Sequence, residues 1–524
     1  MKFRILGPVV RVVDDEGTPI HLTKQAQQLV AVLLAQGGRV SAAELQRMLW
    51  EEESDRRRRA LTTAIFRLRG CIGDNRLLTF EDAGSTFYQL RVEPSDWVDL
   101  RIFRTLVQRA EQAPGADPEV EAGLYGAAVK EWPDPHLSAF PRTKAAEPLV
   151  VGLDRLRSDV LTRWVEVRLD LGQHAELCRE LPALRASYPG HELLIASEML
   201  ALYRSGRKGA AIALYEETAA QLRRKQGTEP GVHLQGVYQQ VQLNKPELHY
   251  RPLPPRETDQ QILASGATNE ATPFRMTQHM LGLEGSLPAD RLAVELVKVG
   301  APEIVEMPKA NELFVTRAIR TIVAQSPVNQ WIELLMGVPT PAAPHVLARR
   351  MRKGTRVVYV SADRPSVILK KPEYTDAITG MTYANLRMPS VTEIMEDPEV
   401  HRLIRTDEPV GIIMRDIPTY LPDDSGLIDF IAKLLGQFPS GSYLVISVGS
   451  SKGLSDRIRQ QIETIMEGMS WQIVWRTERQ VRKLLGGIPG LTWLEEIRPL
   501  HLWRSDLPDQ ELVFHVLSGV ARTD

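Results

Sequence analysis

The sequence has almost no cysteine: Cys71 and Cys178 are the only two, and they lie far apart in the chain. Two such cysteines are too few for a disulfide framework or a cysteine-based metal site, so we expect no bound metal. No apolar run approaches the roughly 18 residues of a membrane span, and Met1-Lys2-Phe3-Arg4 is not followed by a signal-peptide core. The sequence therefore predicts a cytoplasmic protein with no membrane partner.

The chain also has almost no net charge: 64 Lys and Arg residues and 66 Asp and Glu residues give a formal net charge of -2. Such a balance neither supports nor excludes a nucleic-acid partner, since basic residues can be concentrated locally. With 524 residues, of which 43% are hydrophobic and 25% charged, the chain has the composition of an ordered protein with several domains.

Basic residues are concentrated in one stretch, DRRRRALTTAIFRLRGCI, at Asp55–Ile72. Between Arg56 and Arg69 this stretch holds six arginines and no acid. Apolar residues recur as on one face of a helix, at Leu61, Ile65, Leu68 and Ile72. The opposite face collects Arg56, Arg59, Thr63 and Arg67. A helix docked by its apolar side and presenting long cations suits the DNA major groove, although an ordinary solvated helix has the same pattern.

The elements around this helix follow the order of a winged helix-turn-helix. Thr23 and Ser41 are good N-caps for two helices ahead of the basic one. The predicted elements are strands at 2–13 and 19–22, helices at 23–36 and 41–50, the basic helix, and a hairpin of strands at 77–80 and 86–92. In a winged helix the third helix enters the major groove, so the basic helix is the predicted recognition helix.

Three spaced blocks resemble the SARP family of actinobacterial transcriptional activators: LTKQAQQLVAVLLAQGGRVSAAELQRMLW, ALTTAIFRLRGCIG and FYQLRVEPSDWVDLRIF. The resemblance covers about residues 1–250 and implies an OmpR-type winged helix (1–96) followed by a bacterial transcriptional activator domain. On the recognition helix it implies DNA contacts by Arg59, Thr62, Thr63, Phe66, Arg67 and Arg69, to which we add Arg56 and Arg57 as phosphate contacts. Phe66 stands where the family usually has a small polar residue, so it either touches a thymine methyl or packs against the wing.

Residues 97–243 have the pattern of an all-α domain with short loops. The run ALYRSGRKGAAIALYEETAAQL has the period of a tetratricopeptide-like repeat, an architecture that leaves a concave surface for partners. We expect His174 and His191 at the surface of this domain. The prolines and polar residues of 244–271 then predict an interdomain linker.

Residues 272–524 alternate strand-like and helix-like runs, which predicts an α/β fold with a parallel, doubly wound, Rossmann-like sheet. Any ligand of such a sheet lies at the carboxyl ends of its strands. The strands are predicted at 328–335, 355–361, 381–386, 410–415 and 442–448, with further strands at 470–476 and 500–503. The main helices between them are predicted at 343–351, 391–404 and 428–435.

This half resembles the S-adenosylmethionine-dependent methyltransferases of the DUF574 type, in blocks such as PADR, ANELFVTRAIRTI, QWIELLMGVPT and RVVYVSAD. In that family the first strand ends in D-x-G-x-G, because glycine lets the backbone approach the cofactor. Here the first glycine is replaced by Leu335, while Gly337 and the acidic Glu333 remain. After the second strand only Asp363 keeps its charge, and Asn385 replaces an aspartate. The candidate ligand-binding residues are Glu333, Gly337, Asp363 and Asn385.

The sequence blocks that build the methyltransferase fold are retained, whereas several residues that would contact the cofactor are replaced. The resemblance therefore predicts a methyltransferase fold that no longer methylates and has no catalytic residues. The strand at 410–415 also ends in Arg415 and is followed by Asp416, so this strand end is more charged than an apolar cofactor edge. S-adenosylmethionine is then at most a residual ligand, and the domain serves as a sensor of a small-molecule effector, a dimerisation surface or a structural appendage. The alternative is an active methyltransferase tethered to DNA.

The predicted function is that of a sequence-specific transcriptional activator of a biosynthetic gene cluster. The SARP resemblance implies three partners: double-stranded promoter DNA with direct repeats, RNA polymerase including its sigma subunit, and further copies of the chain. It also implies a nucleoid-associated location within the cytoplasm.

Overall fold

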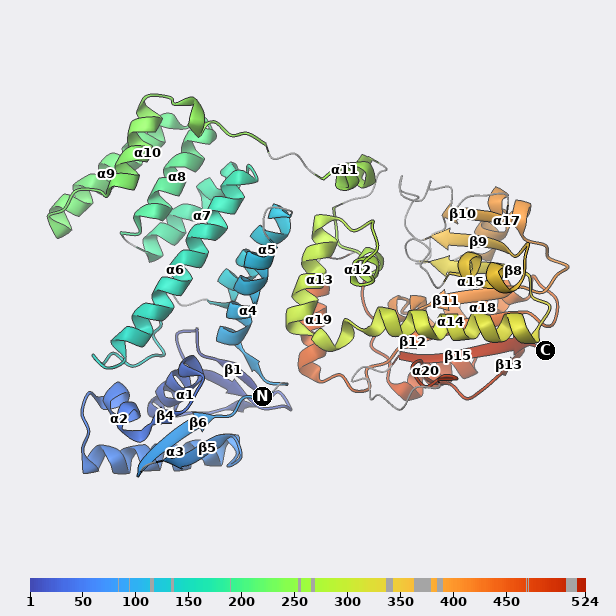
Figure 1. The fold of residues 1–524 in the computed structure, drawn as a ribbon, viewed down its shortest axis with the longest axis horizontal. Coiled ribbons are helices and arrows are strands. Elements are labelled where there is room, and N and C mark those ends of the chain that lie inside the picture. The colour runs from blue at the N-terminus through green and yellow to red at the C-terminus, as the bar shows by residue number, and fades with distance from the viewer. Residues whose placement is uncertain are drawn as a thin grey trace. The chain divides into compact units, whose positions relative to one another are not determined.

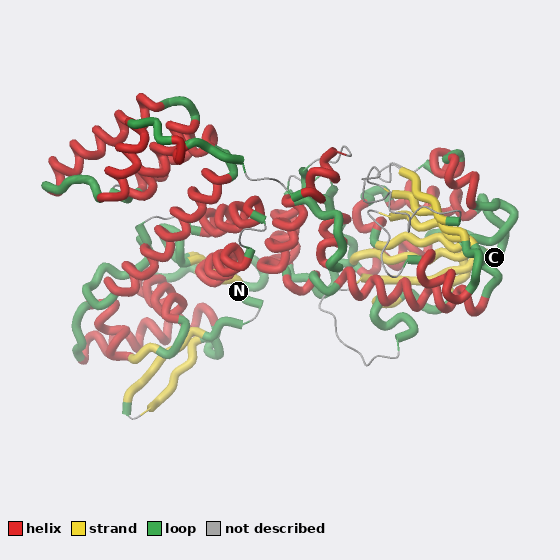
Figure 2. Tube along the Cα trace, turned by 45° about the horizontal axis from the view of Figure 1, so that its top comes forward, coloured by secondary structure: helices red, strands yellow, loops and turns green. Residues whose placement is uncertain are grey.

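The computed structural model of the chain describes residues 1–82, 84–93, 95–113, 117–132, 136–188, 190–252, 256–264, 269–335, 343–361, 378–383, 390–467, 469, 471–505 and 516–524. The chain forms two compact units, Met1–Pro254 and Pro255–Asp524 (Figure 1). Figure 2 shows that the first unit is mostly helical and that the second contains one large twisted sheet flanked by helices.

The first unit begins with the predicted winged helix. A four-stranded sheet of order β3-β2-β1-β7 is formed by β1 (Lys2–Arg4), β2 (Arg11–Val13), β3 (Pro19–Ile20) and β7 (Trp97–Val98). Three helices follow β3, namely α1 (Lys24–Gln36), α2 (Ala42–Trp50) and α3 (Asp55–Ile72). The wing is a three-stranded sheet of order β4-β6-β5, made of β4 (Val40–Ser41), β5 (Leu77–Asp82) and β6 (Ser85–Leu90).

Local capping fixes where these helices begin. The hydroxyls of Thr23 and Ser41 accept the N–H groups of Ala26 and Glu44, which satisfies amide groups that have no partner inside α1 and α2. Ser54 caps α3 in the same way. The two predicted N-caps are therefore confirmed.

The predicted all-α part of the first unit is confirmed, and its described helices are α4 (Asp99–Gln112), α5 (Pro118–Glu131), α6 (Glu147–Asp170), α7 (His174–Ser187), α8 (Glu192–Arg204), α9 (Lys208–Gln226) and α10 (Val232–Gln242). The short helix η1 (Pro246–Leu248) follows them. The expectation that His174 lies at the surface is wrong, because its ring is buried against Tyr250, with 4.9 Å between the ring centroids. His191 is half-buried, since its ring nitrogen caps α8 by accepting the Leu194 N–H.

The second unit is built on a sheet of order β10-β9-β8-β11-β12-β15-β13, with β14 paired to β15. Its strands are β8 (Gln330–Leu335), β9 (Arg356–Ser361), β10 (Thr379–Tyr383), β11 (Gly411–Arg415), β12 (Tyr443–Gly449), β13 (Leu491–Trp493), β14 (Arg498–Pro499) and β15 (Val516–Thr523). The first five are parallel, as predicted, and β15 runs antiparallel to β12. Glycine is required at Gly411, because a Cβ there would collide with the ring of Trp331.

Helices cover both faces of this sheet, which confirms the doubly wound fold. One face packs against α13 (Pro288–Gly300), α14 (Met307–Gln325), α15 (Pro344–Met351) and α19 (Asp456–Met466). The other packs against α16 (Val391–Met395), α17 (Pro398–Leu403), α18 (Asp424–Leu435) and α20 (Glu478–Gly486). The remaining elements are α11 (Glu257–Ala264), α12 (Pro273–Met280), η2 (Pro302–Ile304) and η4 (Ile417–Tyr420).

Three details of the second unit differ from the predictions. The helix expected at 391–404 is split into α16 and α17, because Asp397 caps a new helix that starts at Pro398. Residues 471–477 and 500–503 form no strand, and single backbone bonds such as Val474 N to Thr419 O replace a ladder. Strands β13, β14 and β15 take their place in the sheet.

The predicted linker at 244–271 also differs from the structure, because part of it folds onto the second unit as α11. Asp259 of α11 makes a buried ion pair with Arg291 of α13, with 2.8 Å between the charged atoms. The adjacent Asp290 pairs with Arg275 of α12 at 2.7 Å. The PADR block, which ends in these two residues, thus fastens α11 and α12 to α13.

Candidate functional site

Helix α3 presents a broad exposed face in the first unit. Its apolar side is buried as predicted, at Leu61, Ile65, Leu68 and Ile72. The other side is exposed and holds Arg56, Arg58, Arg59, Thr62, Thr63, Phe66 and Arg67. A fixed helix with long cations and small hydroxyls on its outer side can contact phosphates and base edges at once.

Phe66 is the most exposed large apolar side chain on this face, with 77% of its surface open to solvent. The alternative in which Phe66 packs against the wing is therefore wrong. An exposed aromatic ring in the middle of a cationic face is available for a thymine methyl group.

Two of the predicted DNA-contacting arginines, Arg57 and Arg69, are held by residues outside α3. The Arg69 guanidinium donates from Nε and Nη2 to the Leu77 carbonyl, at 3.0 and 2.8 Å, and so joins α3 to strand β5 of the wing (Figure 1). The Arg57 guanidinium lies 5.6 Å from the centroid of the Trp50 ring and 3.5 Å from a Glu52 carboxylate oxygen. Arg69 is thus half-buried, and Arg57 is less free to reach DNA than Arg56.

The second unit has its candidate site where the order of the parallel strands reverses, between β8 and β11. Ligands of open α/β sheets bind outside the carboxyl ends of the strands at such a point. Glu333 near the end of β8 lies beside Ile413 of β11 in the sheet register. Arg415, the last residue of β11, donates from Nε to Glu333 Oε1 at 2.7 Å and also makes an ion pair with Glu312 of α14.

This ion-pair cluster of Arg415, Glu333 and Glu312 is deeply buried. Glu333 is completely inaccessible to solvent, and only 10% of the Arg415 side chain is exposed. Burial alone would lower the pKa of Arg415, but the carboxylates of Glu333 and Glu312 raise it above its ordinary value. The guanidinium therefore stays charged at the centre of the switch point.

Of the four predicted ligand-binding residues, only Glu333 can be placed. Gly337, Asp363 and Asn385 lie outside the described residues, and so does the side chain of Leu335. Sequence reasoning noted the charge of Arg415 but missed its partners, because Glu312 is 103 positions away in the chain.

In the described part of this site, Glu333 is the side chain from the β8 ending that could accept from S-adenosylmethionine. The cofactor brings a positive sulfonium and an ammonium group, so its polar end needs an acceptor for positive charge. Glu333 Oε1 is already bonded to Arg415, whereas Glu333 Oε2 is buried and has no hydrogen-bond partner among the described residues. An incoming cation would meet this guanidinium at short range and in a buried setting, where repulsion is strong.

Two further properties concern the described residues alone. No group of histidine, cysteine, aspartate or glutamate side chains among them is arranged to hold a metal ion. No helix among them is long and apolar enough to cross a membrane.

Known relatives match each half of the chain separately. Regulatory protein AfsR of Streptomyces coelicolor is 34% identical over 250 residues, which is 47% of this chain and 25% of AfsR. Regulatory protein DnrI of Streptomyces peucetius is 29% identical over 248 residues, or 45% of this chain and 89% of DnrI. The crystal structure of a DUF574 family protein from Streptomyces avermitilis is similar to 49% of this chain over 99% of its own, with 21% identity and a TM-score of 0.45. The chain thus spans about a quarter of the length of AfsR.

Family models account for nearly the whole sequence. A model of the C-terminal region of transcriptional regulatory proteins matches residues 17–84, and one of the bacterial transcriptional activator domain matches 98–242. A model described as S-adenosyl methyltransferase matches residues 259–524, slightly more than half of the chain. Both predicted resemblances are confirmed by these matches. The chain belongs to the S-adenosyl methyltransferase family by its second half, and it joins that domain to the two domains of a SARP-type transcriptional regulator.

Proposed function

We propose that this protein is a sequence-specific transcriptional activator of a biosynthetic gene cluster, in which α3 reads promoter DNA. The observation that supports this most strongly is the exposed face of α3, which carries four exposed arginines and Phe66 on a helix whose other side is buried: Arg56, Arg58, Arg59 and Arg67. Its relatives AfsR and DnrI carry the name of regulatory proteins over the same half of the chain.

Within this interface we assign different roles to different side chains. Arg59, Thr62, Thr63, Phe66 and Arg67 face base edges, whereas Arg56 contacts phosphate near the start of the helix. Arg57 contributes to the phosphate contact from its place beside Trp50. Arg69 positions the wing through the Leu77 carbonyl and acts on DNA indirectly.

Footprinting of the full chain on promoter fragments tests the proposal. We expect protection of direct repeats near the -35 region of a promoter, with two repeats bound cooperatively and one repeat bound weakly. The α3 variant Arg67→Ala should weaken this protection, and Arg104→Ala, which removes an exposed arginine of α4, is the matched control. Equal footprints for both variants would refute the assignment of α3.

We further propose that the helical repeats from α4 to α10 (in the predicted domain 97–243) position neighbouring copies and RNA polymerase, including its sigma subunit. Repeats of this kind expose a surface for partners while burying the other face against their neighbours. Transcription in a purified system, with and without the second promoter repeat, tests this. Activation that persists on a single repeat would contradict the role of a second copy.

For the second unit we propose a regulatory role without methyl transfer. The Arg415 cluster supports this, because it places a buried cation where a cationic cofactor would need an acceptor. Calorimetry of the full chain with S-adenosylmethionine should detect no tight binding. The family match to S-adenosyl methyltransferases favours the alternative, an active enzyme tethered to DNA. Transfer of a labelled methyl group to a metabolite or protein, abolished by Asp363→Ala, would establish that alternative.

A further inference from the structure

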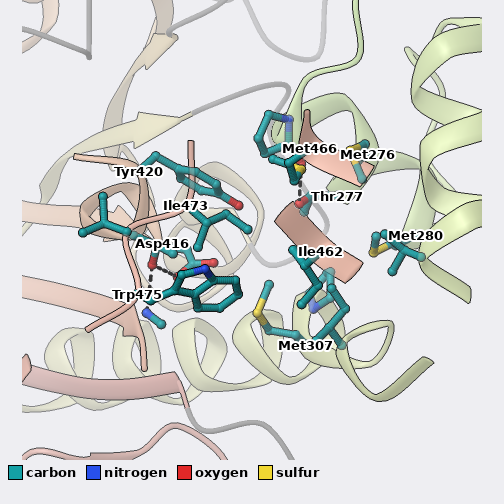
Figure 3. A pocket seen from close by; sticks show the side chains of 17 residues that line it. Met276, Thr277, Met280, Met307, Asp416, Tyr420, Ile462, Met466, Ile473 and Trp475 are labelled. Carbon is teal, nitrogen blue, oxygen red and sulfur yellow. Dashed lines mark hydrogen bonds between the residues drawn. The ribbon is translucent and has the colours of Figure 1, made fainter. Parts of the chain in front are cut away.

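The second unit contains a narrow pocket that begins at Asp416, the residue after Arg415. It opens at the carboxyl ends of β11 and β12 and is walled by η4, α12, α13, α14 and α19. Its accessible volume is about 60 Å³, room for roughly four water molecules. Figure 3 shows Asp416, Tyr420, Ile473 and Trp475 on one side, and side chains of the flanking helices on the other.

The walls of this pocket are almost entirely apolar and unusually rich in methionine. Met276, Met280, Met307 and Met466 line it together with Ile462. Methionine side chains are flexible and polarisable, so they can move aside for ligands of different shape and pack well against aromatic rings. A pocket of this kind therefore accepts an apolar body larger than its resting volume.

Asp416 places a carboxyl group in this apolar wall, and its position is fixed by the turn after β11. Its backbone lies in the left-handed region with a φ of 56°, and its N–H donates to the Ser447 hydroxyl at 3.0 Å. The Thr419 hydroxyl donates to Asp416 Oδ1 at 2.6 Å and accepts the Gly449 N–H at 2.8 Å. A non-glycine residue held in this conformation is common at ligand sites.

The charge of Asp416 has no counterion among the described residues. Burial raises its pKa to about 6, and the hydrogen bonds from Thr419 and Gly449 oppose this rise. The neighbouring Arg415 is paired with Glu333 and Glu312 instead. Tyr420 is the other titratable group in the pocket wall, and burial followed by the charge of Asp416 raises its pKa, so its hydroxyl stays neutral. At neutral pH the pocket thus presents an anion that no cation of the described residues balances.

We propose that this pocket binds a small organic amine, whose ammonium group donates to the Asp416 carboxylate and whose apolar body packs among the methionines. A neutral ligand would leave the carboxylate without a cation, and an anionic ligand would be repelled. The amine supplies the missing positive charge in a buried setting, where a charged hydrogen bond is strong. The role of such an amine as an effector of transcription rests on the proposed function. Its binding to the pocket is independent of that function.

Calorimetry of the full chain at pH 7.5 tests this binding. The probes are butylamine and benzylamine, and their neutral counterparts are butanol and benzyl alcohol. We expect the amines to bind at least about tenfold more tightly than the alcohols, because only the ammonium forms a charged hydrogen bond. Equal affinity of amine and alcohol, or no binding of either amine, would overturn the proposal.

Two variants locate the binding site. Asp416→Asn should abolish the preference for amines, whereas Asp429→Asn, on the exposed side of α18, should leave it intact. Met280→Trp should block both amines by filling the pocket while keeping Asp416, which covers the case in which Asp416→Asn fails to fold. Amine binding that survives both pocket variants would contradict this site. Arg67→Ala should bind amines normally, so a failure of DNA binding remains distinguishable from a failure of amine binding.

Discussion

The arginines of α3 differ in what they touch, and this difference predicts separable effects on DNA binding. Arg67 is exposed on the outer face, where a guanidinium can make two bonds to a guanine. Arg67→Ala should therefore relax base preference and cost about 1–3 kcal/mol on the specific site, with little loss on random DNA. Fluorescence anisotropy with both DNAs measures this. An equal loss on both sequences would assign Arg67 to phosphate instead.

Arg56 stands at the start of the same helix and is the clearer phosphate contact, because Arg57 is held beside Trp50 and Glu52. Arg56→Ala should weaken binding to all sequences evenly and lower the slope of log K against log salt by about 1. Titrations at several salt concentrations give this slope. An unchanged slope would remove Arg56 from the interface.

Asp416 makes the stability of the second unit depend on pH. Its pKa rises from 3.8 in the unfolded chain to about 6 in the fold. The protonated form is therefore favoured by folding, and this stabilisation is complete below pH 3.8 and lost as pH rises through 6. The loss amounts to about 3 kcal/mol. Asp416→Asn should unfold at a higher denaturant concentration than the natural protein at pH 8 and nearly the same one at pH 4. A constant difference between the two would contradict the raised pKa.

At the residue level, the sequence predicted the anchor of α3 and its outer stripe, because helical periodicity sorts side chains by face. It could not decide the position of Phe66, since an aromatic ring fits a wing contact and a groove contact equally. Nor could it show that Asp416 lines a pocket, because the methionines opposite come from α12, α14 and α19. Periodicity within one segment does not show which distant segments of the chain pack together.

At the level of elements, the Arg415 cluster joins strands β8 and β11 to helix α14. Arg415→Met should destabilise the protein by about 3–5 kcal/mol, because it leaves Glu333 and Glu312 buried without a cation. Arg482→Met, which breaks an exposed ion pair with Glu478 on α20, should cost less than about 1 kcal/mol. Denaturant unfolding compares the two. Similar small losses would mean that the cluster is not a structural tie.

Elements defined by local signals were predicted well, and those defined by distant partners were not. Capped helices such as α1 and α2, and the five parallel strands, carry their signals within a few residues. Strand β15 pairs with β12, which lies far away in the sequence, and residues 471–476, predicted to belong to a strand, form none. Helix α11 was assigned to a linker because its tie to α13, the Asp259–Arg291 pair, is not visible in a local pattern.

At the level of the whole molecule, the first unit contains α3, its wing and the helices that support them. A fragment of residues 1–250 should therefore bind the same promoter repeats as the full chain, with an affinity within about tenfold, if α3 is the reading element. Parallel footprints of fragment and full chain check this. Loss of binding in a well-folded fragment would show that the second unit contributes to the DNA interface.

Whether α3 reads promoter DNA is tested most directly by selecting bound sequences from a random pool. The selection is carried out with the full chain and with Arg67→Ala. We expect the full chain to enrich one short repeated motif and Arg67→Ala to enrich the same motif with one position relaxed. Enrichment of an identical motif by both proteins, or of no motif by the full chain, would contradict this role of α3.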